Sequence, residues 1–97
     1  MRVIAKRTLR EFWIKHEDSE QPLKSWYSET TKGRWKHPND LKKEYAKASI
    51  IGDSRVVFNI CGNKYRLIVK INYARQGVFI RFVGTHKEYD KINAEKI

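Results

Sequence analysis

The sequence predicts an α+β fold, in which an antiparallel β-sheet packs on N-terminal helices and a short helix follows at the C-terminal end. Three observations predict this. Apolar side chains recur at helical spacing through the first half of the chain, whereas from Arg55 onward they alternate with a period of two. A helix-capping pattern begins at Thr85, after the last alternating segment. Since the chain has 97 residues and no internal repeat, we expect residues 1–97 to form a single domain.

The first two predicted helices each carry one aromatic-rich stripe. In residues 7–16 the stripe has the i, i+3, i+4, i+7 spacing of an amphipathic helix, and it consists of Leu9, Phe12, Trp13 and His16. The second helix would begin after a cap at Asp18 or Ser19, with Pro22 in its first turn, and would end at Gly33. Its stripe consists of Leu23, Trp26, Tyr27 and Thr30. We expect both stripes to face a core rather than a ligand.

A third helix and a set of strands complete the expected elements. The short helix runs from Asn39 or Asp40 to Lys47 and would bury Leu41, Tyr45 and Ala48, leaving Lys42 and Lys43 exposed. Three strands follow at residues 56–60, 65–72 and 78–84, with turn signals at 61–64 and 74–77. Residues 2–4 would add a short edge strand.

The two turns predict a register for the three strands. With Gly62 and Asn63 at the first tip, Asn59 pairs with Arg66; with residues 74–77 in the second loop, Lys70 pairs with Arg81. This register gathers apolar side chains on one face, the expected core: Phe58, Leu67, Val69, Ile71, Ile80 and Phe82. The opposite face would carry Asn59, Lys64, Arg66, Lys70 and Arg81. A slip of one residue would mix the two sets, so the apolar pattern favours this pairing.

The charge of the chain favours a polyanionic partner. Lysine and arginine number 21 against 11 acidic residues, a net charge of +10, and residues 1–49 and 50–97 each carry +5. Such a field attracts nucleic acid through steering and counterion release. Lys70 opposite Arg81 would be a repulsive cross-strand pair unless an anion lay between them. The alternative is a hydrated basic face on a protein without a nucleic-acid partner.

A candidate site forms where the last strand meets the last helix. Thr85 and Glu88 fit a capping box, so a short helix should begin with His86 and carry Lys87 and Tyr89. The start of a helix offers free N–H groups that suit a phosphate. The register brings Arg66 toward Thr85, so we expect Arg66, His86 and Tyr89 to converge.

These three side chains suit cleavage of RNA without a metal. The reaction requires a proton to leave the 2′-hydroxyl, charge on the phosphorane to be stabilised, and a proton to reach the 5′-oxygen. Histidine transfers protons near neutral pH, arginine binds two phosphate oxygens, and tyrosine stacks on a base or donates a proton. Acidic residues nearby are few, which disfavours two-metal cleavage. A lone histidine near a helix start is also commonly structural; we expect His16 to be structural and His37 to lie in a solvated loop.

Composition excludes several other classes. No apolar run approaches the ~20 residues that a membrane span needs, and charge interrupts the first residues too early for a signal peptide. Cys61 is the only cysteine, which rules out an intrachain disulfide and favours a cytoplasmic location. No cysteine–histidine cluster has zinc-ligand spacing. We therefore expect no cofactor, no metal and no membrane partner.

The strand and helix motifs together resemble the HigB family of toxins from type II toxin–antitoxin pairs. The resemblance rests on the run from Val57 to Ile68, with its Phe-Asn-x-x-Gly-Asn turn, on Ile80-Arg81, and on Thr85-His86-Lys87-Glu88-Tyr89-Asp90. Trp35-x-x-Pro38-x-Asp40-Leu41-Lys42 is similar to the upstream motif of the family. The resemblance covers most of the chain, from Gly33 to Ile92.

The resemblance implies a RelE-like fold and endonucleolytic cleavage of mRNA, typically on the translating ribosome. It also implies a HigA-type antitoxin with a helix-turn-helix domain, through which any contact with DNA would be indirect. The catalytic residues would be His86, Arg66 and Tyr89. RelE has arginine where His86 stands, so the two toxins need not share a proton-transfer scheme. The expected RNA-binding residues are Lys64, Lys70, Arg81, Lys87, Asn59, Lys42 and Lys43.

Two other functions remain open at this point. A non-catalytic RNA- or ribosome-binding module would need only the charge and the aromatic side chains. A DNA-binding regulator is the third alternative, although the chain shows no helix-turn-helix pattern of its own.

Overall fold

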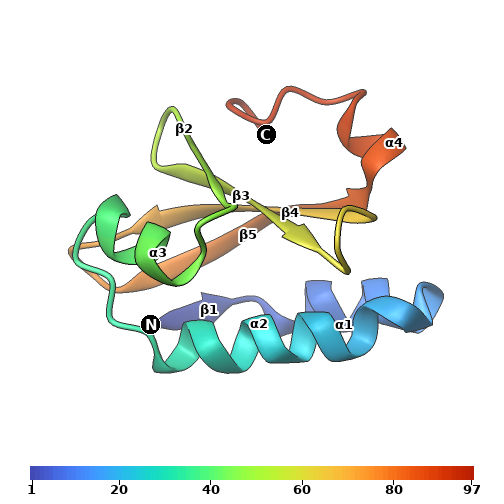
Figure 1. Ribbon diagram of the computed structural model, residues 1–97, viewed down its shortest axis with the longest axis horizontal. Helices are drawn as coiled ribbons and strands as arrows, with labels where there is room; N and C mark the ends of the chain where they lie inside the picture. Colours follow the sequence, from blue (N-terminus) through green and yellow to red (C-terminus); the bar gives the residue numbers. More distant parts are fainter.

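The computed structural model describes residues 1–97 and shows an α+β fold, as predicted: a five-stranded sheet with α1 and α2 on one side (Figure 1). The elements in chain order are β1 (Arg2–Ile4), α1 (Lys6–Lys15), a 3₁₀ turn (Glu17–Ser19), α2 (Glu20–Lys32), α3 (Pro38–Glu44), β2 (Ser49–Ile51), β3 (Arg55–Ile60), β4 (Tyr65–Asn72), β5 (Gly77–Thr85) and α4 (His86–Tyr89). No helix is both long enough and apolar enough to span a bilayer.

The sheet has the strand order β1-β5-β4-β3-β2. The pairs from β2 to β5 are antiparallel, as expected, but β1 runs parallel to β5, so the sheet is mixed. The predicted edge strand at residues 2–4 is confirmed, whereas β2 was not predicted. Three residues are too few to show alternation, so the pairing of Ser49–Ile51 with β3 has no clear signal in the sequence.

The three predicted helices of the first half are present, and one of them, α3, ends earlier than predicted. Helices α1 and α2 match their predicted ranges closely, and Ser19 and Gly33 flank α2. Helix α3 ends at Glu44, three residues before the expected end at Lys47. The ammonium group of Lys42 donates hydrogen bonds of 2.7 Å to the main-chain oxygens of Ala46 and Ala48, which fixes the chain outside the helix.

The register of the first hairpin is confirmed: Asn59 pairs with Arg66 and Phe58 with Leu67. The register of the second hairpin is wrong by two residues. Gln76 adopts a left-handed φ of 55° and its N–H donates to the oxygen of Tyr73, so the loop closes earlier than expected. Lys70 consequently pairs with Phe79, not with Arg81.

The predicted core is also partly wrong, because the pairing of β4 with β5 contains a β-bulge. Ile68 pairs with Phe82 and Val69 with Ile80, so Arg81 has no partner residue on β4 and the alternation of β5 is reset there. Phe82 therefore shares a face with Ile68, whereas the core face of β5 carries Val83 in its place. The main core contains fifteen buried residues, among them Leu67, Val69 and Ile71 of β4 as predicted, and it includes buried side chains of α1 and α2.

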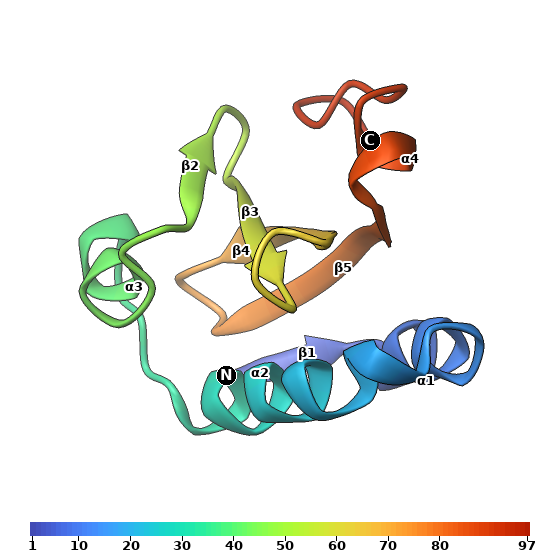
Figure 2. The ribbon, with the colours of Figure 1, turned by 45° about the vertical axis from the view of Figure 1, so that its right-hand side comes forward.

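The opposite face of the sheet, which we call the outer face, is neither wholly polar nor wholly exposed to solvent. It carries the charged side chains of β3 and β4, yet Ile68 is completely buried on it. Figures 1 and 2 show that the segment following α4 lies on this side, away from α1 and α2.

Candidate functional site

The start of α4 is fixed by the predicted capping box. The Thr85 hydroxyl accepts a hydrogen bond from the N–H of Glu88 at 3.1 Å, and the Glu88 carboxylate accepts one from the N–H of Thr85 at 2.8 Å. The bond from the Thr85 N–H favours the ionised carboxylate and holds the pKa of Glu88 below its usual value. Helix α4 has only one turn, so this cap orients the side chains of His86 and Tyr89.

Most of the N–H groups at the start of α4 already have partners within the protein, which leaves the N–H of Lys87 as the one that α4 could offer to a phosphate. The N–H groups of Thr85 and Glu88 are used by the capping box, and the N–H of His86 donates to the oxygen of Lys64 at 3.2 Å. This last bond ties α4 to the β3–β4 turn. Its effect is to hold the helix beside the strand that carries Arg66.

The guanidinium group of Arg66 lies beside the ring of Tyr89, with 5.7 Å between the guanidinium carbon and the ring centroid. Arg66 is only 9% exposed. Its Nη2 donates to Oδ1 of Asn63 at 2.8 Å and its Nη1 donates to the main-chain oxygen of Asn63 at 3.1 Å. The sequence prediction placed Asn63 at the turn tip but gave it no role. It orients the arginine from both its side chain and its main chain.

His86 lies at the same end of the molecule, one helical turn before Tyr89. Its Nδ1 faces the Asp90 carboxylate at 3.2 Å, which orients the imidazole and leaves Nε2 without a protein partner. The ring is about half exposed. No hydrogen bond or ring contact joins His86 to Arg66, so the structure brings Arg66 and Tyr89 together and leaves His86 at the rim of the same site.

Several of the predicted RNA-binding cations already have partners within the protein. Lys64 forms an ion pair with Asp18, and Lys70 pairs with Asp53 at 3.3 Å. Arg81 donates from Nε to the main-chain oxygen of Ile97 at 3.2 Å. The predicted repulsive pair of Lys70 and Arg81 is wrong, because Lys70 pairs with Phe79 across the strands, and the Asp53 carboxylate neutralises part of the charge of Lys70.

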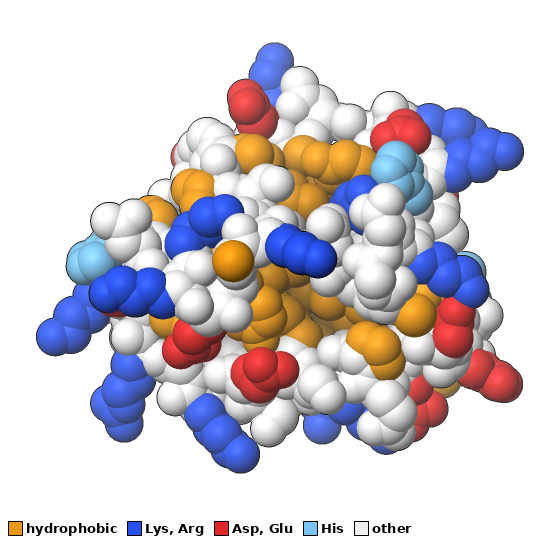
Figure 3. Space-filling view, viewed as in Figure 1, with side chains coloured by type: hydrophobic (Ala, Val, Ile, Leu, Met, Phe, Trp, Pro, Cys, Tyr) orange, Lys and Arg blue, Asp and Glu red, His pale blue; other side chains and the backbone are white.

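The remaining predicted RNA contacts divide between the two ends of the sheet. Lys87 is exposed on α4, and Asn59 is exposed on β3 opposite Arg66. Lys42 and Lys43 lie on α3, at the other end from α4 (Figures 1 and 2), and the ammonium of Lys42 is engaged by the main chain. Lysine and arginine side chains are spread over the visible face rather than gathered in one patch (Figure 3). Charge alone therefore does not locate the site.

The other two histidines lie outside this group. His16 is half-buried and stacks on Phe12, with 4.3 Å between ring centroids, and meets the edge of Tyr65 at 5.4 Å, which agrees with the expected structural role. His37 is exposed, with its Nε2 3.9 Å from the Asp40 carboxylate. No three His, Cys, Asp or Glu side chains are grouped in a way that could hold a metal ion.

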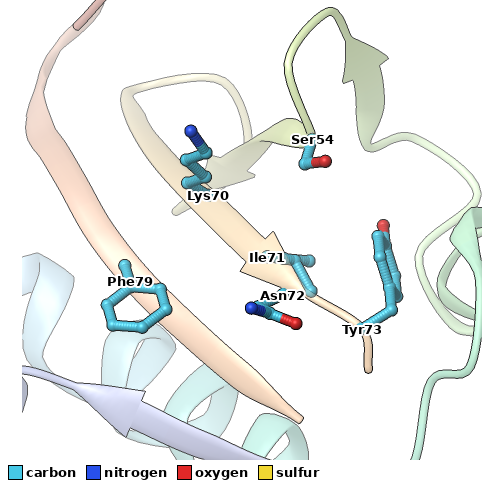
Figure 4. Close-up of a pocket in the computed structure, with 6 residues that line it drawn as sticks. All are labelled: Ser54, Lys70, Ile71, Asn72, Tyr73 and Phe79. Carbon is cyan, nitrogen blue, oxygen red and sulfur yellow. The ribbon is translucent and has the colours of Figure 1, made fainter. Parts of the chain in front are cut away.

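A cavity of about 300 Å³ lies at the far end of β4 from Arg66. Lys70, Asn72, Tyr73 and Phe79 line it together with Ser54 and Ile71 (Figure 4). Arg66 and Lys70 are four residues apart on one strand, so their Cα atoms are separated by roughly 13 Å. The cavity is a feature separate from the group around Arg66.

Comparison with known proteins shows that the chain is similar to toxins of toxin–antitoxin systems. A family model described as HigB_toxin, the RelE-like toxic component of a toxin–antitoxin system, matches residues 19–92. The chain is 30% identical over 96 residues to the mRNA interferase toxin HigB of Escherichia coli (strain K12), covering 97% of this chain and 92% of that protein. The mRNA interferase HigB of Shigella flexneri matches with the same identity and coverage. The family match spans α2 through α4 and so includes Arg66, His86 and Tyr89.

Proposed function

Because the chain belongs to the HigB family of RelE-like toxins, we propose that it is an endoribonuclease that cleaves mRNA and thereby inhibits translation. The relatives that it matches over 97% of its length are named mRNA interferases. The observation that carries the proposal is the guanidinium of Arg66 beside the ring of Tyr89, with His86 on the same helical turn.

In the proposed reaction His86, Arg66 and Tyr89 act on one phosphodiester. The 2′-hydroxyl loses its proton and its oxygen attacks phosphorus, the bond from phosphorus to the 5′-oxygen breaks, and that oxygen takes up a proton. His86 transfers protons through Nε2, because Nδ1 is held by Asp90. Arg66 stabilises the charge that develops on the phosphorane oxygens, and Tyr89 stacks on a base or supplies the second proton.

The orientation of Arg66 supports its assigned role. A guanidinium that is 9% exposed and bonded twice to Asn63 is held before the substrate arrives. Preorganised donors stabilise developing charge without reorganising during the reaction. The reaction as proposed uses side chains for both proton transfers, so cleavage should persist in EDTA.

The proposed partners follow from the same family membership. We propose that the substrate is mRNA on the ribosome, and that a HigA-type antitoxin with a helix-turn-helix domain neutralises the toxin. The exposed groups around the site, Asn59 and Lys87, would contact the RNA; Lys43 on α3 would contact RNA further away. Contact with DNA would occur only through the antitoxin.

Expression without antitoxin tests the proposal. The parent chain should arrest growth, and His86→Ala or Arg66→Ala should relieve the arrest while the protein stays folded. His37→Ala is the matched control for the histidine, and Arg10→Ala, on α1, is the control for the arginine; both should remain toxic. A folded double variant of His86 and Arg66 that is equally toxic would refute the site.

The pattern of RNA ends separates cleavage from mere binding. Induction of the parent chain should create new 5′ ends within mRNA, and the His86→Ala chain should create none. Growth arrest without new ends would instead indicate a non-catalytic RNA- or ribosome-binding module.

A further inference from the structure

One aspartate joins the helical side of the molecule to the turn between β3 and β4. Asp18 lies in the 3₁₀ turn that links α1 to α2. Its Oδ1 accepts a hydrogen bond of 2.5 Å from the hydroxyl of Tyr65, and its Oδ2 accepts one from the ammonium group of Lys64. Its main-chain oxygen accepts a longer bond, of 3.6 Å, from the thiol of Cys61. Three residues in or beside the turn are thus bonded to one residue between the helices.

The β3–β4 turn needs to be held from outside because its backbone is strained. Cys61 has a left-handed φ of 56°, which is unfavourable for a residue with a Cβ atom. Backbone of this kind persists only where the surrounding structure fixes it. Tyr65 is itself firmly placed, since it is only 3% exposed and its ring meets that of Phe12 with 5.1 Å between centroids. Asp18 contacts both ends of the turn, so it fixes the position of the turn relative to the helices.

The charges at this contact complement one another. The hydrogen bonds from Lys64 and Tyr65 hold the pKa of Asp18 below its usual value, so its carboxylate is ionised at neutral pH. The bond to Asp18 in turn raises the pKa of Lys64 and that of Tyr65, which keeps both groups protonated as donors. The contact therefore persists at the pH at which RNA would be bound.

Both halves of the candidate site are attached to the turn that Asp18 holds. Asn63 orients the guanidinium of Arg66 through its side chain and its main chain. The main-chain oxygen of Lys64 accepts the N–H of His86 at 3.2 Å, which ties α4 to the same turn. A displacement of the turn would therefore move the arginine relative to the histidine, and a shift of about 1 Å between reacting groups can cost on the order of 100-fold in rate.

We infer that Asp18 is a positioning residue for RNA cleavage, which holds the β3–β4 turn where Arg66 and α4 are aligned. The inference rests on the proposed function, because it takes RNA cleavage as the reaction that needs this alignment. Asp18 acts through the turn and not on the substrate. A helix cap does not account for this residue, because the N-cap of α2 is Ser19 and the carboxylate of Asp18 is bonded to Lys64 and Tyr65.

The kinetics of cleavage of an mRNA fragment by Asp18 variants test the inference. Asp18→Ala removes both carboxylate contacts and should lower kcat about 10- to 100-fold, while KM changes less than about twofold. Asp18→Asn keeps an oxygen that can accept a bond from Tyr65 but loses the charge that attracts Lys64, so it should lower kcat by a smaller factor. Glu17→Ala is the matched control, because it removes the same charge from an exposed side chain of the same 3₁₀ turn; its kcat should be that of the parent chain.

Two further measurements separate positioning from a general loss of stability. In NMR spectra recorded without RNA, the Nε–H resonance of Arg66 and the amide resonance of His86 should shift in both Asp18 variants and should stay in place in Glu17→Ala. The combination of Asp18→Ala with Asn63→Ala should lose less kcat than the product of the two single losses, because both changes act through Arg66. If Asp18→Ala does not fold, Asp18→Asn replaces it in each measurement.

The possible outcomes distinguish this inference from the proposed function. Unchanged kcat in the Asp18 variants, a loss confined to KM, or a loss that multiplies with that of Asn63→Ala would overturn the inference and leave the proposed function standing. An equal loss in Glu17→Ala would also overturn it, since the effect would then come from charge alone. If the parent chain cleaves no RNA, the proposed function fails and the inference fails with it.

Discussion

Replacing Asn63 by alanine tests whether the β3–β4 turn prepares Arg66 for catalysis. The change removes the Oδ1 acceptor that lies 2.8 Å from Nη2 of Arg66. It leaves the main-chain acceptors of Asn63, at 3.1 Å, and Tyr65, at 3.4 Å, in place. The arginine thus keeps its place in β4 but loses one of the bonds that orient its guanidinium plane.

The size of the expected effect follows from the kind of bond that is lost. A hydrogen bond to a charged group contributes about 1.5–3 kcal/mol, and about 1.4 kcal/mol corresponds to a factor of ten in rate. If half or more of that energy serves to orient Arg66 in the transition state, kcat/KM for RNA cleavage should fall about 4- to 150-fold. The loss should appear in kcat rather than in KM, because the bond prepares a group for the developing charge.

Single-turnover cleavage of an mRNA fragment, free and on translating ribosomes, measures this effect. Asn39→Ala is the matched control, since Asn39 is exposed on α3 and no side-chain hydrogen bond is formed by it. Thermal unfolding would show whether Asn63→Ala weakens the fold as a whole. Unchanged kcat in the Asn63 variant, or a loss confined to KM, would refute the view that this turn orients Arg66.

The cap of α4 and the register of β5 give two further predictions. Because the pKa of Glu88 is lowered in the folded state, its stabilisation of α4 should be complete above its unfolded pKa of about 4.3 and should be lost as the pH falls through the lower folded value. NMR spectra of α4 recorded against pH should show this loss. Thr85→Ala removes half of the cap and should cost about 1 kcal/mol of stability, so it should weaken the helix even at neutral pH. Leu67→Ala should cost about 2–5 kcal/mol in urea unfolding, whereas Phe82→Ala should cost clearly less, because the bulge places that ring outside the main core; equal costs would contradict the bulge.

The helices and the first hairpin were predictable because their signals are local. The stripe from Leu9 to His16 has one spacing and one interpretation, and Ser19 and Gly33 flank α2 as expected. In the first hairpin the Gly62–Asn63 turn and the apolar alternation specify the same register, so each supports the other. The capping box at Thr85 is likewise contained within four residues.

The second hairpin was not predictable because its loop and its bulge have no comparable signal. The residue that closes the loop is Gln76, which has a left-handed φ although it is neither a glycine nor an asparagine, the residues that usually indicate this conformation in a sequence. An error of two residues preserves the alternation, so the wrong register still sorted most side chains correctly. The bulge at Arg81 then changes the parity, and only there did a core assignment fail, at Phe82.

The outer face shows why a count of charges could not by itself identify the site. Lys70 was expected to need an external anion, but Asp53, which precedes β3 in a tight turn, supplies one. Arg66 was expected to be one cation among several. Its low exposure and its bonds to Asn63 distinguish it from the other lysines and arginines, whose charges are solvated or paired with a carboxylate. What distinguishes a group ready for an incoming phosphate is therefore a cation that neutral acceptors hold in place. Arg66 meets that condition at Asn63, so RNA binding should depend more on Arg66 than on the lysines that outnumber it.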